Sequence, residues 1–143
     1  MKEHQKRTVN VLKKLKVLLG EDDDLNQLLF TKTITYWEAE IKIASTGTEV
    51  LELLAAEDFD IILLDIQLPL KSGIEVAREI RMLKDPVKKN IPIIAITAFI
   101  LTGEEKKYIS AGINACLTKP CKENELYETI KHLIEKKTNT ENQ

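Results

Sequence analysis

The apolar residues of this chain gather in five short runs separated by longer amphipathic segments. These runs cover residues 15–19, 41–44, 59–65, 91–97 and 115–120. Nearly continuous apolar runs of this length are typical of strands that are covered on both faces, as in a parallel sheet. We therefore predict five parallel strands over these ranges.

Between the runs, apolar residues recur at spacings of three and four, which predicts helices. The predicted stripes are Leu25, Leu28 and Leu29; Val50, Leu51 and Leu54; Ile74, Ala77 and Ile80 with Met82 or Leu83; and Leu126, Ile130, Leu133 and Ile134. A less apolar segment over residues 101–111 is the weakest helix. Five strands alternating with five helices predict a doubly wound α/β domain.

The domain boundaries follow from where this alternation begins and ends. We assign residues 15–137 to the domain, residues 1–14 to a basic leader or linker, and residues 138–143 to a disordered tail. A chain of 143 residues is long enough for one complete core and too short for two ordinary domains.

Composition narrows the class of protein. An apolar content of 43% and a charged content of 31% fit a soluble globular domain rather than a disordered or membrane-embedded chain. The net charge of −2 gives no electrostatic reason to expect nucleic-acid binding. Two cysteines, Cys116 and Cys121, complete neither a disulfide framework nor a zinc pattern. The sequence carries no apolar leader, so we expect a cytoplasmic protein.

Polar residues follow the predicted strands at the points where the strands end. In an open parallel sheet, ligands bind outside the carboxyl ends of the strands. The residues at these ends are Glu21 and Asp22 after the first strand, Asp65 after the third, Thr97 after the fourth, and Lys119 after the fifth. We therefore expect three carboxylates, a hydroxyl and an ammonium group to converge on one edge of the sheet.

This set of groups predicts phosphoryl chemistry. Carboxylate oxygens held close together suit Mg²⁺, which prefers hard oxygen ligands. A lysine and a threonine can neutralise and bind phosphoryl oxygens. Asp65 ends a central strand, and a carboxylate in that position can attack phosphorus to form an aspartyl phosphate. The neighbouring Asp23 and Asp24 are expected to face water at a helix start.

The motifs around these residues resemble those of two-component response-regulator receiver domains. They are VLLGEDDDLNQ (17–27), IILLDIQLPLKSG (61–73), IIAITA (93–98) and LTKP (117–120). The resemblance covers nearly the whole chain and implies the flavodoxin-like receiver fold, with strand order 2-1-3-4-5. The form of the GED, LNQ and DIQLP motifs is more similar to receivers of hybrid sensor histidine kinases than to DNA-binding regulators.

The resemblance also implies residue roles. Asp65 would be the phosphoacceptor, Thr97 the switch hydroxyl, and Lys119 the lysine that precedes a cis proline. Asp22 would bind Mg²⁺ directly, Glu21 mainly through water, and Gln67 through its backbone carbonyl. The implied phosphoryl donor is a phosphohistidine on a histidine kinase or a histidine phosphotransfer protein. The resemblance allows homodimerisation through the face of the fourth and fifth helices, which the sequence neither requires nor excludes.

One position departs from the family pattern, and two other functions stay open. Receivers usually carry Tyr or Phe three residues before the lysine, where this chain has Cys116, so the usual aromatic–threonine coupling is in question. A phosphohydrolase of the haloacid dehalogenase type would also use Asp65 and Mg²⁺, but needs a second Asp where Gln67 stands. A phosphorylation-independent interaction domain would be indicated by loss of Asp65 or Lys119, and both are present.

Overall fold

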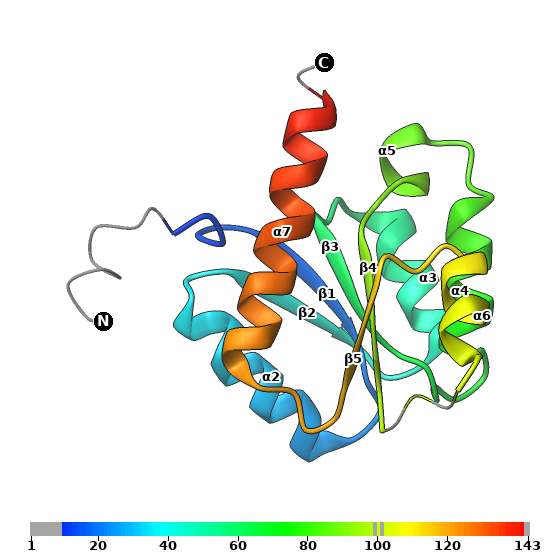
Figure 1. Ribbon diagram of the computed structural model, residues 1–143, viewed down its shortest axis with the longest axis horizontal. Helices are drawn as coiled ribbons and strands as arrows, with labels where there is room; N and C mark the ends of the chain where they lie inside the picture. Colours follow the sequence, from blue (N-terminus) through cyan, green and yellow to red (C-terminus); the bar gives the residue numbers. More distant parts are fainter. Residues whose placement is uncertain (1–9, 99, 101, 142–143) are drawn as a thin grey trace.

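The computed structural model describes residues 10–98, 100 and 102–141. A single parallel sheet of five strands has the order β2-β1-β3-β4-β5, which confirms the expected fold (Figure 1). The strands are β1 (Lys16–Gly20), β2 (Glu40–Ala44), β3 (Ile61–Asp65), β4 (Ile93–Thr97) and β5 (Ala115–Thr118). Each lies within, or one or two residues from, the apolar run that predicted it.

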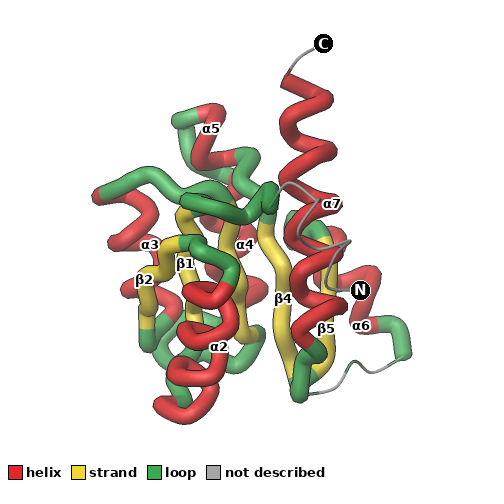
Figure 2. Tube along the Cα trace, turned by 90° about the vertical axis from the view of Figure 1, so that its left-hand side faces the viewer, coloured by secondary structure: helices red, strands yellow, loops and turns green. Residues whose placement is uncertain are grey.

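Helices cover both faces of this sheet, as the two views together show (Figures 1 and 2). Helices α2 (Asp24–Tyr36) and α7 (Glu123–Glu141) pack on one face, and α3 (Gly47–Ala56), α4 (Gly73–Arg81) and α6 (Glu104–Ser110) pack on the other. The four-residue helix α5 (Pro86–Lys89) was not expected from the sequence. It forms because the side chain of Asp85 accepts hydrogen bonds at its start and Pro86 occupies its first turn.

Strand β3 shows how one sequence supplies two cores. Side chains of successive strand residues point to opposite faces. Ile62 and Leu64 belong to the apolar cluster beneath α3, α4 and α6, whereas Ile61 and Leu63 belong to the cluster beneath α2 and α7. All four are fully buried, which is why the run is continuously apolar rather than alternating.

The apolar stripe predicted for the first helix is wrong. Leu25, Leu28 and Leu29 are 62%, 50% and 53% exposed, and Ile34 is the buried residue of α2. Gln27 lies on the inner side of the helix and donates through Nε2 to the carbonyl oxygen of Glu21. This polar anchor and Ile34, two turns further on, set the rotation of α2, so the three leucines face outward.

The assignment of residues 1–14 to a leader needs correction for its described part. Leu12 is only 1% exposed and belongs to the core cluster under α2 and α7. Asn10 donates through Nδ2 to the carbonyl oxygen of Trp37. The backbone N–H of Lys14 donates to the carbonyl oxygen of Glu38. The folded domain therefore includes residues 10–14, because Leu12 fills a core position; residues 1–9 lie outside the described part.

The expectation of a disordered tail is corrected for residues 138–141, which continue helix α7 to Glu141. The hydroxyl of Thr138 donates to the carbonyl oxygen of Ile134, one turn earlier. Adding a residue to an existing helix costs far less than starting one, so the helix extends beyond its buried stripe. Residues 142–143 lie outside the described part.

Candidate functional site at the carboxyl edge of the sheet

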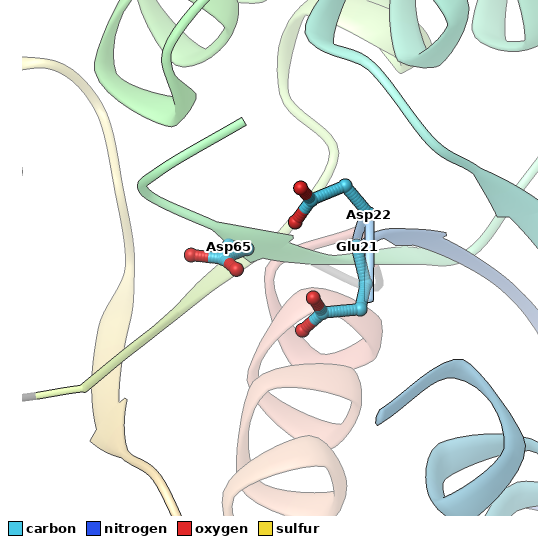
Figure 3. A group of neighbouring side chains, drawn as sticks. All are labelled: Glu21, Asp22 and Asp65. Carbon is cyan, nitrogen blue, oxygen red and sulfur yellow. The ribbon is translucent and has the colours of Figure 1, made fainter. Parts of the chain in front are cut away.

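Three carboxylates from two neighbouring strands meet at the carboxyl edge of the sheet. Glu21 and Asp22 follow β1, and Asp65 ends β3, which pairs directly with β1 (Figure 3). One ligand oxygen from each carboxylate lies within 4.8 Å of the others. Glu21 is 1% exposed and Asp65 is 7% exposed, whereas Asp22 is open to solvent.

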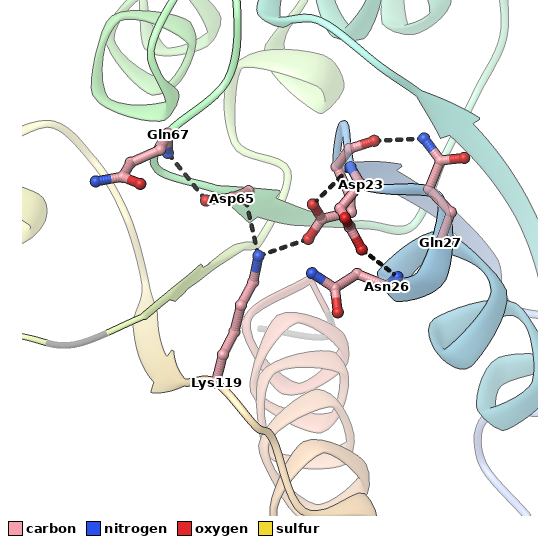
Figure 4. A network of polar contacts seen from close by, with 7 residues as sticks. Asp23, Asn26, Gln27, Asp65, Gln67 and Lys119 are labelled. Carbon is pink, nitrogen blue, oxygen red and sulfur yellow. Dashed lines mark hydrogen bonds and ion pairs between the residues drawn. The ribbon is translucent and has the colours of Figure 1, made fainter.

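The ammonium group of Lys119 binds two of these carboxylates (Figure 4). Its Nζ lies 2.7 Å from Glu21 Oε1 and 2.8 Å from Asp65 Oδ2. Burial by itself lowers the pKa of Lys119, but the hydrogen bonds that it donates to Asp65 and Glu21, with the attraction of their negative charges, more than offset this, so the pKa is raised. Lys119 is therefore a permanent cation at this edge and balances part of the negative charge.

Asp65 is held in place from the other side by the loop that follows it. Its Oδ1 accepts a hydrogen bond of 2.9 Å from the backbone N–H of Gln67. The loop then returns so closely that a Cβ on Gly73 would lie 2.7 Å from the carbonyl oxygen of Asp65. Only glycine fits this approach, which brings the start of α4 against the end of β3.

Thr97 and Lys119 reach the same edge from β4 and β5. Asp65 pairs with Ile96 in the β3–β4 register, so Thr97 lies one residue beyond it on the adjacent strand. The backbone N–H of Lys119 donates to the carbonyl oxygen of Thr97, and the Lys119–Pro120 peptide bond is cis. Thr97 is 5% exposed, and it lines a cavity of about 270 Å³ together with Gln67.

The donor set fits a hard divalent cation. Its oxygens come from three carboxylates, and one of them, Asp22, remains exposed for an ion to approach. Carboxylate oxygens of this kind are the ligands that Mg²⁺ uses, with water completing an octahedral shell. Asp23 lies outside this cluster of three carboxylates, and its side chain accepts a hydrogen bond from the backbone N–H of Asn26 and caps α2.

The structure thus brings together the side chains of Glu21, Asp22, Asp65 and Lys119, and it places Thr97 at the same edge of the sheet. Asp23 and Asp24 are exposed, as expected. Sequence reasoning missed Tyr108 of α6, which lines the same cavity as Thr97. The segment around Tyr108 has few apolar residues, and nothing in its pattern indicates that the ring is buried. The burial of Tyr108 becomes visible only in the folded structure, where α6 lies close to the end of β4.

The fold and the site define a class of protein, doubly wound α/β domains with acids and a lysine at the carboxyl edge of the sheet. Comparison with known proteins identifies the family. The response regulator receiver domain family matches residues 17–131. The chain therefore belongs to this family, the receiver domains of two-component signalling systems. None of the helices in the described part of the chain combines the length and apolar character that crossing a membrane requires.

Two curated relatives differ in how much of their length the chain covers. It is 38% identical to the autoinducer 2 sensor kinase/phosphatase LuxQ of Vibrio vulnificus over 118 residues, which are 82% of this chain and 13% of LuxQ. It is 37% identical to the polar-differentiation response regulator DivK of Brucella ovis over 118 residues, which are 82% of this chain and 94% of DivK. The chain thus spans a small part of one relative and nearly all of the other.

Solved structures of receivers are similar as well. The receiver domain of the sensor histidine kinase PA1611 from Pseudomonas aeruginosa, with a magnesium ion coordinated in its active site cleft, is 30% identical with a TM-score of 0.77, covering 85% of this chain and 98% of that one. The receiver domain of Ssk1 from Saccharomyces cerevisiae was crystallised with the histidine phosphotransfer protein Ypd1. That match is 28% identical with a TM-score of 0.74, covering 84% and 88% of the two chains.

Proposed function

We propose that this chain accepts a phosphoryl group on Asp65 from a phosphohistidine of another protein or domain. The observation that carries the proposal is the geometry of the Asp65 carboxylate. One oxygen is bound by Lys119 Nζ at 2.8 Å and the other by the backbone N–H of Gln67 at 2.9 Å. In the transfer, a carboxylate oxygen forms a bond to phosphorus as the bond to the histidine nitrogen breaks, and the nitrogen keeps that electron pair.

The surrounding side chains would stabilise the charge on the transferred group. Lys119 would neutralise a phosphoryl oxygen, and the Thr97 hydroxyl would donate to another. Glu21, Asp22, Asp65 and the backbone carbonyl of Gln67 would hold Mg²⁺, as supported by the acidic cluster and by the magnesium ion in the PA1611 receiver. When bound, this ion would offset the negative charge of the phosphoryl oxygens.

The exposed face of α2 supports a protein as the phosphoryl donor. Leu29 lines a groove of about 120 Å³ that reaches Pro120 and includes Lys119. Leu25 and Leu28 are exposed on the same helix. A donor histidine must come within bonding distance of Asp65, so the surface beside Lys119 is covered during transfer. The donor would thereby bury the leucines that α2 leaves open to water.

We place this receiver in a hybrid sensor histidine kinase of the cytoplasm, with a histidine kinase or a histidine phosphotransfer protein as donor. The receiver regions of LuxQ and PA1611, and the Ypd1 complex of Ssk1, support this context. The phosphorylation chemistry of the site does not require a hybrid kinase, since the same Asp65, Lys119 and Thr97 would serve a free-standing receiver equally well.

The experiment that tests the proposal is incubation with acetyl phosphate and Mg²⁺, followed by intact mass measurement. We expect the mass to increase by one phosphoryl group, and to stay unchanged in an Asp65→Asn variant or in the presence of EDTA. Lys119→Gln should slow formation of the adduct by about 10²- to 10³-fold, because one charge-stabilising donor is removed. Folding of each variant is checked by circular dichroism.

Three outcomes separate the candidate functions. A stable adduct on Asp65 supports the receiver function. Repeated release of inorganic phosphate with rapid turnover would instead support a hydrolase, in which a residue other than Gln67 would have to act as the acid and base. No adduct on folded protein would leave a docking domain that does not depend on phosphorylation.

A further inference from the structure

A cavity of about 270 Å³ beside the phosphoacceptor is lined in part by an aromatic residue, Tyr108, which has no role in the proposed function. The cavity is lined by Gln67 from the loop after β3, by Thr97 at the end of β4, and by Tyr108 and Glu104 from α6. Among the described residues that line it, Tyr108 alone is aromatic. A movement of Thr97 toward Asp65 would change the wall of this cavity, which Tyr108 also forms.

Within the described part of the chain, the Tyr108 side chain makes one hydrogen bond. The residue is 3% exposed, and its phenol hydroxyl donates to Glu104 Oε2 at 2.9 Å, one helical turn earlier. Burial, and then the hydrogen bond to Glu104, raise the pKa of Tyr108 to about 12, so the hydroxyl stays protonated and remains a donor. The ring packs with the apolar cluster beneath α4 and α6.

The position on β5 that faces this region carries a small side chain. Cys116 pairs with Ala95 in the β4–β5 register and packs against the same apolar cluster as Tyr108. A small residue on the strand and a buried ring on the helix thus contribute to the same apolar cluster.

We infer that Tyr108 on α6 is the aromatic residue whose position is coupled to Thr97, in the place left by Cys116 on β5. The inference rests on the proposed phosphorylation of Asp65. When the Thr97 hydroxyl binds a phosphoryl oxygen, the cavity wall shifts, the ring moves into the cavity, and the Tyr108–Glu104 hydrogen bond is released. Glu104 lies in the first turn of α6, so the start of this helix changes together with the site.

The test places 3-fluorotyrosine at position 108 of the full chain and follows its ¹⁹F resonance as Mg²⁺ and beryllium fluoride are added. Beryllium fluoride bound to an aspartate stands in for the acyl phosphate, and its own ¹⁹F signal reports independently that the adduct has formed. We expect the position 108 resonance to shift as the adduct signal appears. Fluorotyrosine at position 127, on the opposite face and hydrogen-bonded to Asn10, is the matched control and should not shift.

Two variants distinguish coupling from simple packing. Thr97→Val keeps the shape of the side chain but lacks the hydroxyl that would bind the adduct. The adduct should therefore need a higher concentration of beryllium fluoride, and at saturation it should form without a shift at position 108. Tyr108→Phe keeps the ring but lacks the bond to Glu104, and should bind beryllium fluoride about 2- to 10-fold more tightly because one restraint on the resting position is gone.

The results separate failure of the inference from failure of the proposed function. An adduct signal with an unchanged position 108 resonance would overturn the coupling and leave the phosphoacceptor role intact. An equal shift in Thr97→Val would also overturn it, since the hydroxyl would then play no part. Absence of any adduct on folded protein would overturn both.

Discussion

Arg81, at the end of α4, joins this helix to two later segments of the chain, residues 89–91 and 112–114. Its Nε and Nη2 donate to the carbonyl oxygen of Gly112, and its Nη1 donates to those of Lys89 and Ile91. Nη2 also donates to Asn114 Oδ1, which accepts the backbone N–H of Ile93 at the start of β4. Burial lowers the pKa of Arg81, yet a guanidinium remains charged at neutral pH. One side chain therefore fixes how β4 and β5 begin.

We expect Arg81→Met to lower the free energy of unfolding by about 2–4 kcal/mol, because several partly buried carbonyl groups lose a charged donor. Urea denaturation measures this change. Arg78→Met is the matched control, since Arg78 lies on the same helix but is exposed, and it should change stability by less than about 0.5 kcal/mol. Equal effects of the two substitutions would show that the hydrogen bonds of Arg81 contribute little.

Helix α2 is the element whose two faces serve different purposes. Its inner face carries Ile34, which is fully buried, and Gln27, which is anchored to the end of β1. Its outer face carries Leu25, Leu28 and Leu29, which are at least half exposed, and Leu29 also lines the groove to Pro120. Helix α2 therefore carries more apolar side chains than its packing against the sheet buries.

We expect Leu28→Ser to leave stability within about 0.5 kcal/mol of the original protein, because the side chain is half exposed. The same change should slow phosphoryl transfer from a phosphohistidine protein while leaving phosphorylation by acetyl phosphate unchanged. Ile34→Ala is the contrasting variant and should cost about 2–5 kcal/mol of stability. If transfer from the protein donor is unaffected by Leu28→Ser, this face of α2 does not bind the donor.

The strands were easier to predict than the faces of the helices. A strand that is buried on both sides has a continuous run of apolar residues. The apolar pattern of the sequence therefore predicts the strands Ile61–Asp65 and Ile93–Thr97. In α2, leucines and polar residues are mixed around the helix, and the choice of inner face depends on the Gln27 contact with the Glu21 carbonyl. Helix α5 depends on a local cap at Asp85, which a search for apolar stripes does not detect.

At the scale of the whole molecule, the start of the described chain closes the core beneath α2 and α7. Leu12 lies in that core, and Asn10 contacts the end of α2 through the carbonyl oxygen of Trp37. The Trp37 ring in turn packs edge-on against Tyr127 of α7, with ring centroids 5.1 Å apart. Residues 10–14 therefore tie two helices together that are more than eighty residues apart in sequence.

We expect Leu12→Ala to lower the free energy of unfolding by about 2–5 kcal/mol through loss of buried apolar contacts and creation of a cavity. Chemical denaturation measures the loss. Met82→Ala, at a position that is 82% exposed, is the control and should have an effect below about 0.5 kcal/mol. If Leu12→Ala changes the free energy of unfolding as little as the control does, residues 10–14 are a linker and not part of the folded domain.

The sequence by itself determined the sheet, its flanking helices and the residues at the strand ends. It did so because burial on both faces imposes a continuous apolar run, and because the carboxyl ends of parallel strands must share one edge. Tertiary structure decided the rotation of α2, the inclusion of Leu12 in the core and the burial of Tyr108 beside Thr97. These depend on contacts between distant segments, whose net energies are set by packing and burial that no local pattern of residues encodes.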